Sequence, residues 1–271
     1  MKIIIEPNKK ATHYWSELKS FKELFYFLAW KDILVRYKQT TIGLLWAFIR
    51  PFLSIVVFTI IGNLGSFPNE GVPYALLVAV GILPWQFFSS AFSEASNSMV
   101  SNSGMISKVY FPRIIIPVSS VIVCIIDFIV ALVMTVVLML WFNYLPSYRI
   151  IFMPFFFALL LILALGIGFW IASLNVKYRD FRYIVPFIIQ FGVFISPVMY
   201  ISNTFTNPAI RMIYSLNPLV GIIDGFRWSM LGGNISIYWP AVVYSAVVSI
   251  FFLVFGFSFF RKTERFFADI V

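Results

Sequence analysis

The sequence predicts an all-α integral membrane protein with six transmembrane helices and both termini in the cytoplasm. Apolar residues make up 61% of the 271 residues and charged residues only 11%, whereas soluble domains carry about 25% charged residues. The mean hydropathy is +0.93. Stretches near the length of about 20 apolar residues that a membrane crossing requires occur six times, at 42–61, 74–92, 114–142, 151–174, 184–200 and 239–260.

The distribution of Lys and Arg predicts which side of the membrane each connection occupies. Of the 20 such residues, sixteen lie in residues 1–41, 93–113, 175–183 and the tail 261–271. Only Arg149, Arg211 and Arg227 lie in the connections on the other side, and Arg50 lies inside the first span. Cationic connections remain cytoplasmic, so both termini are predicted inside. The net charge of +9 then indicates anchoring to anionic lipid rather than binding of nucleic acid.

Residues 1–41 form the predicted cytoplasmic interface segment of a single transmembrane domain, 1–271. Ser20 and Glu23 have the spacing of a capping box, which predicts a helix from there to about Tyr37. The apolar residues of this helix do not form a clean stripe, because Asp32 interrupts it. Two interpretations stay open: a helix lying among the lipid headgroups, or one packed under the bundle.

Spans one to five occupy residues 42–200, and two of them contain a charge. Arg50 in span one either extends back to the headgroups or faces a transport path. Asp127 lies near the middle of span three, where an acid is rare. It is either a functional site or a hydrogen-bonded packing residue. Pairing with Arg50 is possible, although the depths of the two residues match poorly.

Two connections have structure of their own. Residues 93–113 begin with Ser and Asn and end in KVYFPR; a short helix is predicted there, interrupted by Pro112 before span three. Residues 201–238 are apolar but contain Pro208, Pro218, Gly232 and Gly233. They are predicted to form two short extracytoplasmic helices that dip into the outer leaflet, because irregular backbone is tolerated there when protein covers it. Span six, 239–260, follows.

The residues that most enzymes need are missing. His13 is the single histidine and Cys124 the single cysteine, which excludes a histidine–cysteine metal site and a Ser-His-Asp triad within the spans. No Gly-rich phosphate-binding loop is present. The chain is therefore predicted to be neither an enzyme nor a metalloprotein, and any uphill transport must draw on an ion gradient or a partner.

Three stretches together resemble a known family. They are LAWKDILVRYK at 28–38 running on to Arg50-Pro51, KVYFPR at 108–113, and NVKYRDFR at 175–182 leading to SPVMY at 196–200 and Asn217-Pro218. The pattern is similar to the permease subunit of type-2 ABC exporters that move polysaccharides such as O-antigen, capsular glycan or teichoic acid. The resemblance covers nearly the whole chain, and its third stretch is the most specific.

This resemblance implies partners and a location. It implies a homodimer of the chain, together with two copies of a separate subunit that holds ATP and Mg²⁺, in the inner membrane of a bacterium. No cofactor is then expected in this chain. The implied substrate is a polysaccharide linked to a polyprenyl pyrophosphate, which would pass through a pore between the two copies, lined by spans one, two and five.

The resemblance also implies roles for individual residues. Those implied to face or couple to the ATPase are Lys108, Tyr110, Phe111, Pro112, Arg113, Lys177, Tyr178, Arg179, Asp180, Phe181 and Arg182. Those implied to line the substrate path are Lys38, Trp46, Arg50, Phe52, Trp85, Phe88, Phe187, Phe191 and Phe194. Those implied to form an outer gate are Asn217, Pro218, Asp224 and Arg227.

Alternatives remain for these roles and for the function. The aromatic residues could instead face lipid or pack in the core. The cluster at 177–182 is either a cationic anchor or a coupling turn stiffened by ion pairs among Arg179, Asp180 and Arg182. An ion-coupled transporter or flippase with Asp127 as its proton site is a second functional hypothesis, although other acids within the spans are lacking. A scaffold or drug-exporting relative of the same fold is a third.

Overall fold

The computed structural model describes residues 18–38, 45–202, 207–233, 235–264 and Phe267. These described residues form helices and connecting turns, with no strand among them. The all-α prediction is therefore confirmed. The first three residues of predicted span one, 42–44, lie outside the described residues, as do the other predicted residues beyond these ranges.

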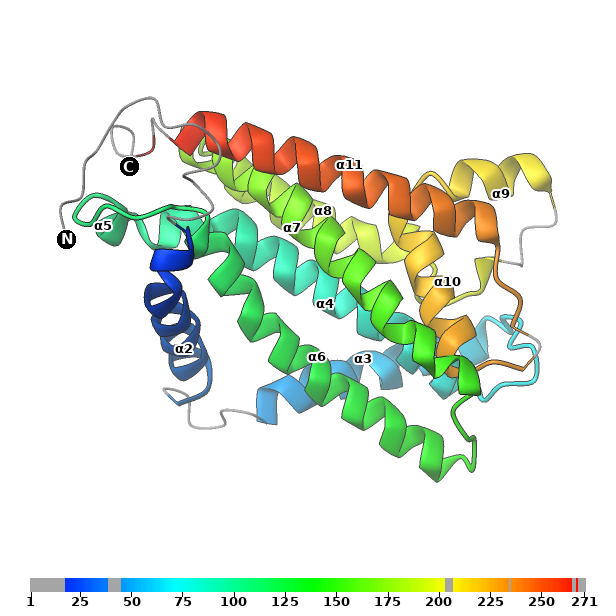
Figure 1. The fold of residues 1–271 in the computed structure, drawn as a ribbon. Coiled ribbons are helices and arrows are strands. Elements are labelled where there is room, and N and C mark those ends of the chain that lie inside the picture. Colours follow the sequence, from blue (N-terminus) through cyan, green and yellow to red (C-terminus); the bar gives the residue numbers. More distant parts are fainter. Residues whose placement is uncertain (1–17, 39–44, 203–206, 234, 265–266, 268–271) are drawn as a thin grey trace.

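Within the described part of the chain, five helices are long and apolar enough to cross a membrane (Figure 1). They are α3 (Leu45–Leu64), α4 (Tyr74–Ser101), α6 (Ile115–Trp141), α7 (Met153–Lys177), which directly follows the 3₁₀ turn η1 (Tyr148–Phe152), and α11 (Trp239–Thr263). The fifth predicted span, 184–200, overlaps a shorter apolar helix, α8 (Phe181–Ile195). Each predicted span thus coincides with a helix, and five of them have the length of a crossing.

Two helix ends differ from the prediction for identifiable reasons. Helix α4 does not end at residue 92 but continues to Ser101, because its polar extension packs on the bundle: Asn175 at the end of α7 donates to the Ser96 carbonyl at 3.0 Å. Helix α8 stops at Ile195 because Ser196 precedes Pro197, and the residue before a proline is biased away from the helical region.

Helix α4 forms the centre of the bundle. It packs against α3, α6, α7, α8 and α10 (Pro218–Met230). In its apolar window 78% of the residues are buried, compared with 17% in α3. Helices α7 and α11 pack most extensively with each other, and a Cβ at Gly256 would lie 2.0 Å from the Gly166 carbonyl oxygen. Gly166 and Gly256 therefore allow the two helices to approach closely.

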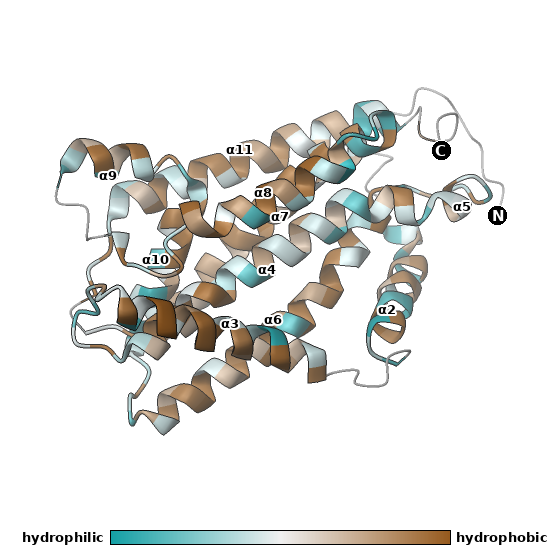
Figure 2. Cartoon of the chain, turned by 180° about the vertical axis from the view of Figure 1, so that it is seen from behind, coloured by the Kyte–Doolittle hydropathy of each residue, from teal (hydrophilic) through white to brown (hydrophobic). Residues whose placement is uncertain are grey.

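Short elements occupy the two ends of the bundle. Helix α2 (Lys22–Lys38), α5 (Ser103–Ile106) and the end of α11 lie together at one end, and α9 (Pro208–Tyr214) lies at the opposite end (Figure 1). Polar residues are visible on α2 and at the end of α11, whereas α3 is predominantly apolar (Figure 2). Helix α2 buries Leu28 and Ala29 and leaves Tyr26 and Trp30 exposed. It therefore packs on the bundle and also carries uncovered aromatic residues.

Candidate functional site

A polar cavity lies between the end of α2 and helices α3, α4 and α6. Its volume is about 770 Å³. The polar side chains that line it are Arg36, Tyr37, Arg50, Ser54, Gln86, Ser89, Ser90 and Asp127. Because polar groups at the depth of apolar helices are costly and usually serve a function, this cavity is the first candidate site.

Asp127 is the centre of an ion-pair cluster at this cavity, which we call the inner cluster (Arg36, Tyr37, Glu94 and Asp127). Its carboxylate lies 3.1 Å from the Arg36 guanidinium and accepts a 2.5 Å hydrogen bond from the Tyr37 hydroxyl. Arg36 also lies 3.6 Å from the Glu94 carboxylate. Burial, reinforced by the bond to Asp127, raises the pKa of Tyr37, so its hydroxyl remains a donor at neutral pH. Asp127 is therefore a paired and hydrogen-bonded acid, and whether it also acts in transport stays a prediction.

The sequence did not indicate the inner cluster. It suggested only Arg50 as a possible partner for Asp127, and at a poorly matched depth, whereas the structure supplies Arg36 and Tyr37 from α2. Arg50 is exposed and lines the cavity, without an ion pair or side-chain hydrogen bond to any described residue. Lys38 ends α2 and is exposed, but it is not among the cavity residues.

Helices α3 and α8 carry uncovered aromatic residues. Trp46 and Phe52 on α3 are 47% and 48% exposed. On α8, Phe187 and Phe191 have ring centroids 4.5 Å apart, and these two residues and Phe194 are all exposed. Both helices pack on α4, and the view from behind shows both on the near side (Figure 2). The molecule therefore has one side with two aromatic helix surfaces.

Trp85 and Phe88, also implied to line the path, are buried within this chain, at 6% exposure each. Trp85 fills the space beside Gly192 of α8, where a Cβ would lie 2.5 Å from the indole ring. These two residues therefore support the position of α8 against α4.

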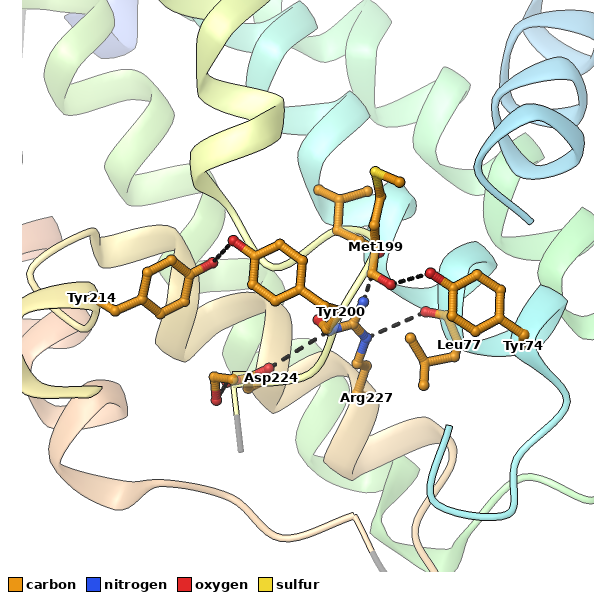
Figure 3. A network of polar contacts seen from close by, with 9 residues as sticks. Tyr74, Leu77, Met199, Tyr200, Tyr214, Asp224 and Arg227 are labelled. Atoms are coloured by element: carbon orange, nitrogen blue, oxygen red, sulfur yellow. Dashed lines mark hydrogen bonds and ion pairs between the residues drawn. The ribbon is translucent and has the colours of Figure 1, made fainter. Parts of the chain in front are cut away.

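A second polar cluster lies near the other end of the bundle; we call it the outer cluster (Tyr74, Ser202, Asp224 and Arg227; Figure 3). Arg227 of α10 has no exposed surface. Its guanidinium donates to the Val198 and Tyr200 carbonyls at 2.7 Å each and to the Leu77 carbonyl at 3.3 Å. These bonds attach the irregular chain after α8 to α4 and α10.

The remaining polar atoms of the outer cluster complete this attachment. The Arg227 guanidinium lies 3.7 Å from one Asp224 oxygen, while the Ser202 hydroxyl donates to the other. Tyr74 donates to the Met199 carbonyl. Asp224 and Arg227, implied to be outer-gate residues, thus lie in the interior.

Asn217 and Pro218, also implied to belong to the gate, begin α10. The Asn217 side-chain oxygen accepts from the Leu219 backbone N–H at 3.0 Å, as an N-cap does. The gate role of these four residues stays a prediction.

The residues implied to face the ATPase lie at the end of the bundle that holds α5. In the first group, Lys108 and Tyr110 are exposed, whereas Phe111 and Pro112 are buried. The Arg113 backbone N–H donates to the Glu264 carboxylate at 2.6 Å, which connects this segment to the end of α11. The buried residues therefore anchor the segment and leave Lys108 and Tyr110 at the surface.

The second group joins α7 to α8. Lys177, Tyr178, Arg179, Asp180 and Arg182 are exposed, and only Phe181 is partly buried. The ion pairs proposed for the coupling-turn alternative are not formed among the described residues: no charged side chain at 177–182 pairs with an opposite charge there, and all of them are exposed. Lys177 lies instead over the Tyr178 ring, 5.2 Å from its centroid. The coupling role of this turn stays a prediction.

Comparison with known proteins identifies the family. The family model described as ABC-2 type transporter matches residues 23–231. An O-antigen export system permease protein RfbA from Klebsiella pneumoniae is 27% identical over 245 residues, covering 89% of this chain and 92% of the relative. A protein of the same name from Myxococcus xanthus is 25% identical over 213 residues, covering 78% and 81%. With its apolar helices and a family match that spans most of its length, the chain belongs to the ABC-2 type transporter family of multi-pass membrane permeases.

Proposed function

We propose that this chain is the permease of an ATP-driven exporter that carries an O-antigen-like polysaccharide on a polyprenyl pyrophosphate across the inner membrane. Two copies would form the pore, and two copies of a separate ATP-binding subunit would hold ATP and Mg²⁺. The observation that carries the proposal is the pair of uncovered aromatic surfaces on α3 and α8. Flat aromatic faces stack on the C–H faces of sugars without requiring one hydrogen-bond pattern, which suits a polymer that must slide.

The proposed topology has six spans with both termini inside. Helix α8 begins where α7 ends (Figure 1) and, with 15 helical residues, would cross together with the irregular chain that the outer cluster holds. Such backbone is tolerated at membrane depth where protein satisfies it, as Arg227 does for Val198 and Tyr200. Helices α9 and α10 would form the outer gate as a re-entrant pair.

The substrate would enter from the end that holds α2. Arg50 on the wall of the polar cavity, with Lys38 close by in sequence, supplies positive charge for a pyrophosphate, since cations bind phosphate oxygens with charge-assisted hydrogen bonds. The exposed residues at 108–110 and 177–182 would contact the ATPase. Asp180→Ala would then leave insertion intact and lower export.

Aromatic pairs on two helices offer a matched test. Phe187→Ala/Phe191→Ala removes the exposed pair from α8, and Phe251→Ala/Phe255→Ala removes an exposed stacked pair, with centroids 5.8 Å apart, from α11. We expect the α8 double variant to reduce surface polysaccharide several-fold at equal protein level, and the α11 control to leave it close to the wild-type amount. Surface polysaccharide is measured on gels of whole cells. Equal export by both variants would contradict the pore assignment.

The partner is tested by purifying the tagged chain from its native cell in mild detergent. A near-stoichiometric protein with ATP-binding motifs, identified by mass spectrometry, would support the ATP-driven exporter. Isolation of the chain alone, in a detergent that preserves such complexes, would contradict it.

A further inference from the structure

A second cavity, formed as an apolar groove, lies at the end of the bundle that holds α5, on the flank made by α2, α6, α7 and α11. Its volume is about 610 Å³, within the range of about 300–1,000 Å³ typical of ligand pockets. The residues that line it are Leu18, Lys19, Lys22, Phe25, Ile114, Ile115, Val118, Phe169, Leu253, Val254, Phe257 and Ser258. The apolar interior is thus bordered by Lys22 at the start of α2 and by Lys19 just before it.

The two lysines place positive charge at the edge of the groove. Lys19 and Lys22 are exposed and three residues apart, and neither ammonium group pairs with a described residue. Glu23, the acid in the first turn of α2, makes an ion pair with neither. Lys22 also lies in the first turn of α2, where the helix dipole contributes partial positive charge and favours anions. This arrangement favours binding of an anion at the edge of the groove, next to the two lysines.

The groove opens toward lipid. Ile115 and Phe169 form a buried floor, whereas Val254 on its α11 wall is 61% exposed. None of the lining residues belongs to α3 or α8, the helices proposed to face a second copy. The groove lies at the end where α11 finishes with Arg261 and Lys262, and such cationic helix ends lie at the cytoplasmic headgroups. A lipid of the inner leaflet would therefore have its phosphate at the level of the lysines.

We propose that this groove binds one anionic phospholipid of the inner leaflet, with an acyl chain along Phe169, Val254 and Phe257 and the phosphate between Lys19 and Lys22. An acyl chain gains little by leaving the other lipid tails, because the bilayer is as apolar as the groove. The selectivity must therefore come from the charge. The bound lipid would hold the first turn of α2 against the bundle. The other end of α2 carries Arg36, which pairs with Asp127 of α6.

The test measures retained lipid by native mass spectrometry of the full chain purified from nanodiscs of phosphatidylcholine and phosphatidylglycerol in equal amounts. We expect phosphatidylglycerol to be retained preferentially. Lys19→Gln/Lys22→Gln should weaken that preference roughly 10- to 30-fold, because each cation near an anionic lipid surface contributes about 1 kcal/mol of binding free energy. Lys108→Gln/Lys177→Gln, which removes the same charge from exposed positions outside the groove, should retain it.

A second pair of variants separates loss of binding from loss of folding. Val254→Trp fills the groove, while Val247→Trp places the same ring two turns away on α11; both valines are 61% exposed. Only Val254→Trp should lose the lipid, and both should give the same amount of folded protein. Equal retention of the two lipids by the wild type, equal retention by the two tryptophan variants, or equal loss in the two lysine double variants would overturn the proposal.

Discussion

Arg227 and Arg36 both pair with acids in this bundle, but they occupy opposite environments. Arg227 of the outer cluster has no exposed surface, and its acceptors include the backbone carbonyls of Leu77, Val198 and Tyr200. Arg36 of the inner cluster is 25% exposed, borders a cavity and pairs with the carboxylates of Glu94 and Asp127.

The difference separates a fixed part of the fold from a movable one. The carbonyls that Arg227 binds would lose their partner in a site that water does not reach, so breaking these bonds carries the full desolvation penalty. The carboxylates that Arg36 binds are partly solvated, and water can replace the arginine at small cost. We therefore expect α2 to move relative to α4 and α6 during export while α10 stays attached to the chain after α8.

Replacing each arginine is the strongest test of this difference between a fixed and a movable cluster, and has the largest expected effect. Arg227→Leu leaves Asp224 buried without its cation and should destabilise the protein by about 3–5 kcal/mol. Little folded protein should then reach the membrane, as measured by fluorescence-detected size-exclusion chromatography. Arg36→Leu is the matched control and should yield folded protein with reduced export. Comparable loss of folded protein in both variants would contradict the distinction.

A methyl group placed against the Arg227 guanidinium should have the next largest effect. A Cβ at position 81 would lie 2.4 Å from the guanidinium and 2.8 Å from the Val198 carbonyl oxygen. Gly81→Ala should therefore cost about 1–3 kcal/mol through overpacking, seen as a lower melting temperature in detergent. Gly104→Ala is the control, because no atom lies within 4 Å of its added Cβ. An unchanged melting temperature for Gly81→Ala would mean that the Arg227 guanidinium can move aside without loss of stability, and would contradict the fixed position of the outer cluster.

Neutralising the acid of the inner cluster should affect transport more than stability. Asp127→Asn keeps the size of the side chain but removes the charge that holds Arg36 at 3.1 Å. We expect protein levels near those of the wild type and reduced surface polysaccharide. Asp32→Asn, which removes a neighbouring pair with Lys31 at 3.2 Å, should change export less. Full export by Asp127→Asn would show that the inner cluster has no part in transport.

The smallest expected effect comes from a single hydroxyl. Tyr37→Phe removes the 2.5 Å hydrogen bond to Asp127 and leaves the ring in place, so we expect a loss of about 1 kcal/mol. Tyr26→Phe is the control on the same helix, since Tyr26 is 69% exposed. The melting temperatures of both variants are compared in the same detergent. A larger loss of melting temperature for Tyr26→Phe than for Tyr37→Phe would contradict a stabilising role of the Tyr37–Asp127 hydrogen bond.

The sequence predicted the helices well because each depends on a local pattern. Apolar runs identified every membrane helix, and the largest errors in the helix ends occur where tertiary contacts extend α4 and where Pro197 shortens α8. The inner cluster could not be predicted in this way, because Tyr37 and Asp127 are 90 residues apart. The outer cluster left a partial signal: Asp224 and Arg227, three residues apart in an apolar segment, already form a pair of the helical spacing.

The attachment at Arg227 also imposes an order on membrane insertion. The Val198 carbonyl accepts its hydrogen bond from a residue that is synthesised 29 positions later. The Ser196 hydroxyl likewise accepts a 3.1 Å hydrogen bond from the later residue Asn217. While the ribosome is still synthesising α10, the chain after α8 has unsatisfied carbonyls and cannot settle among lipid tails. The nascent protein must therefore keep this segment hydrated, at the membrane surface or in the translocation channel, until α10 arrives.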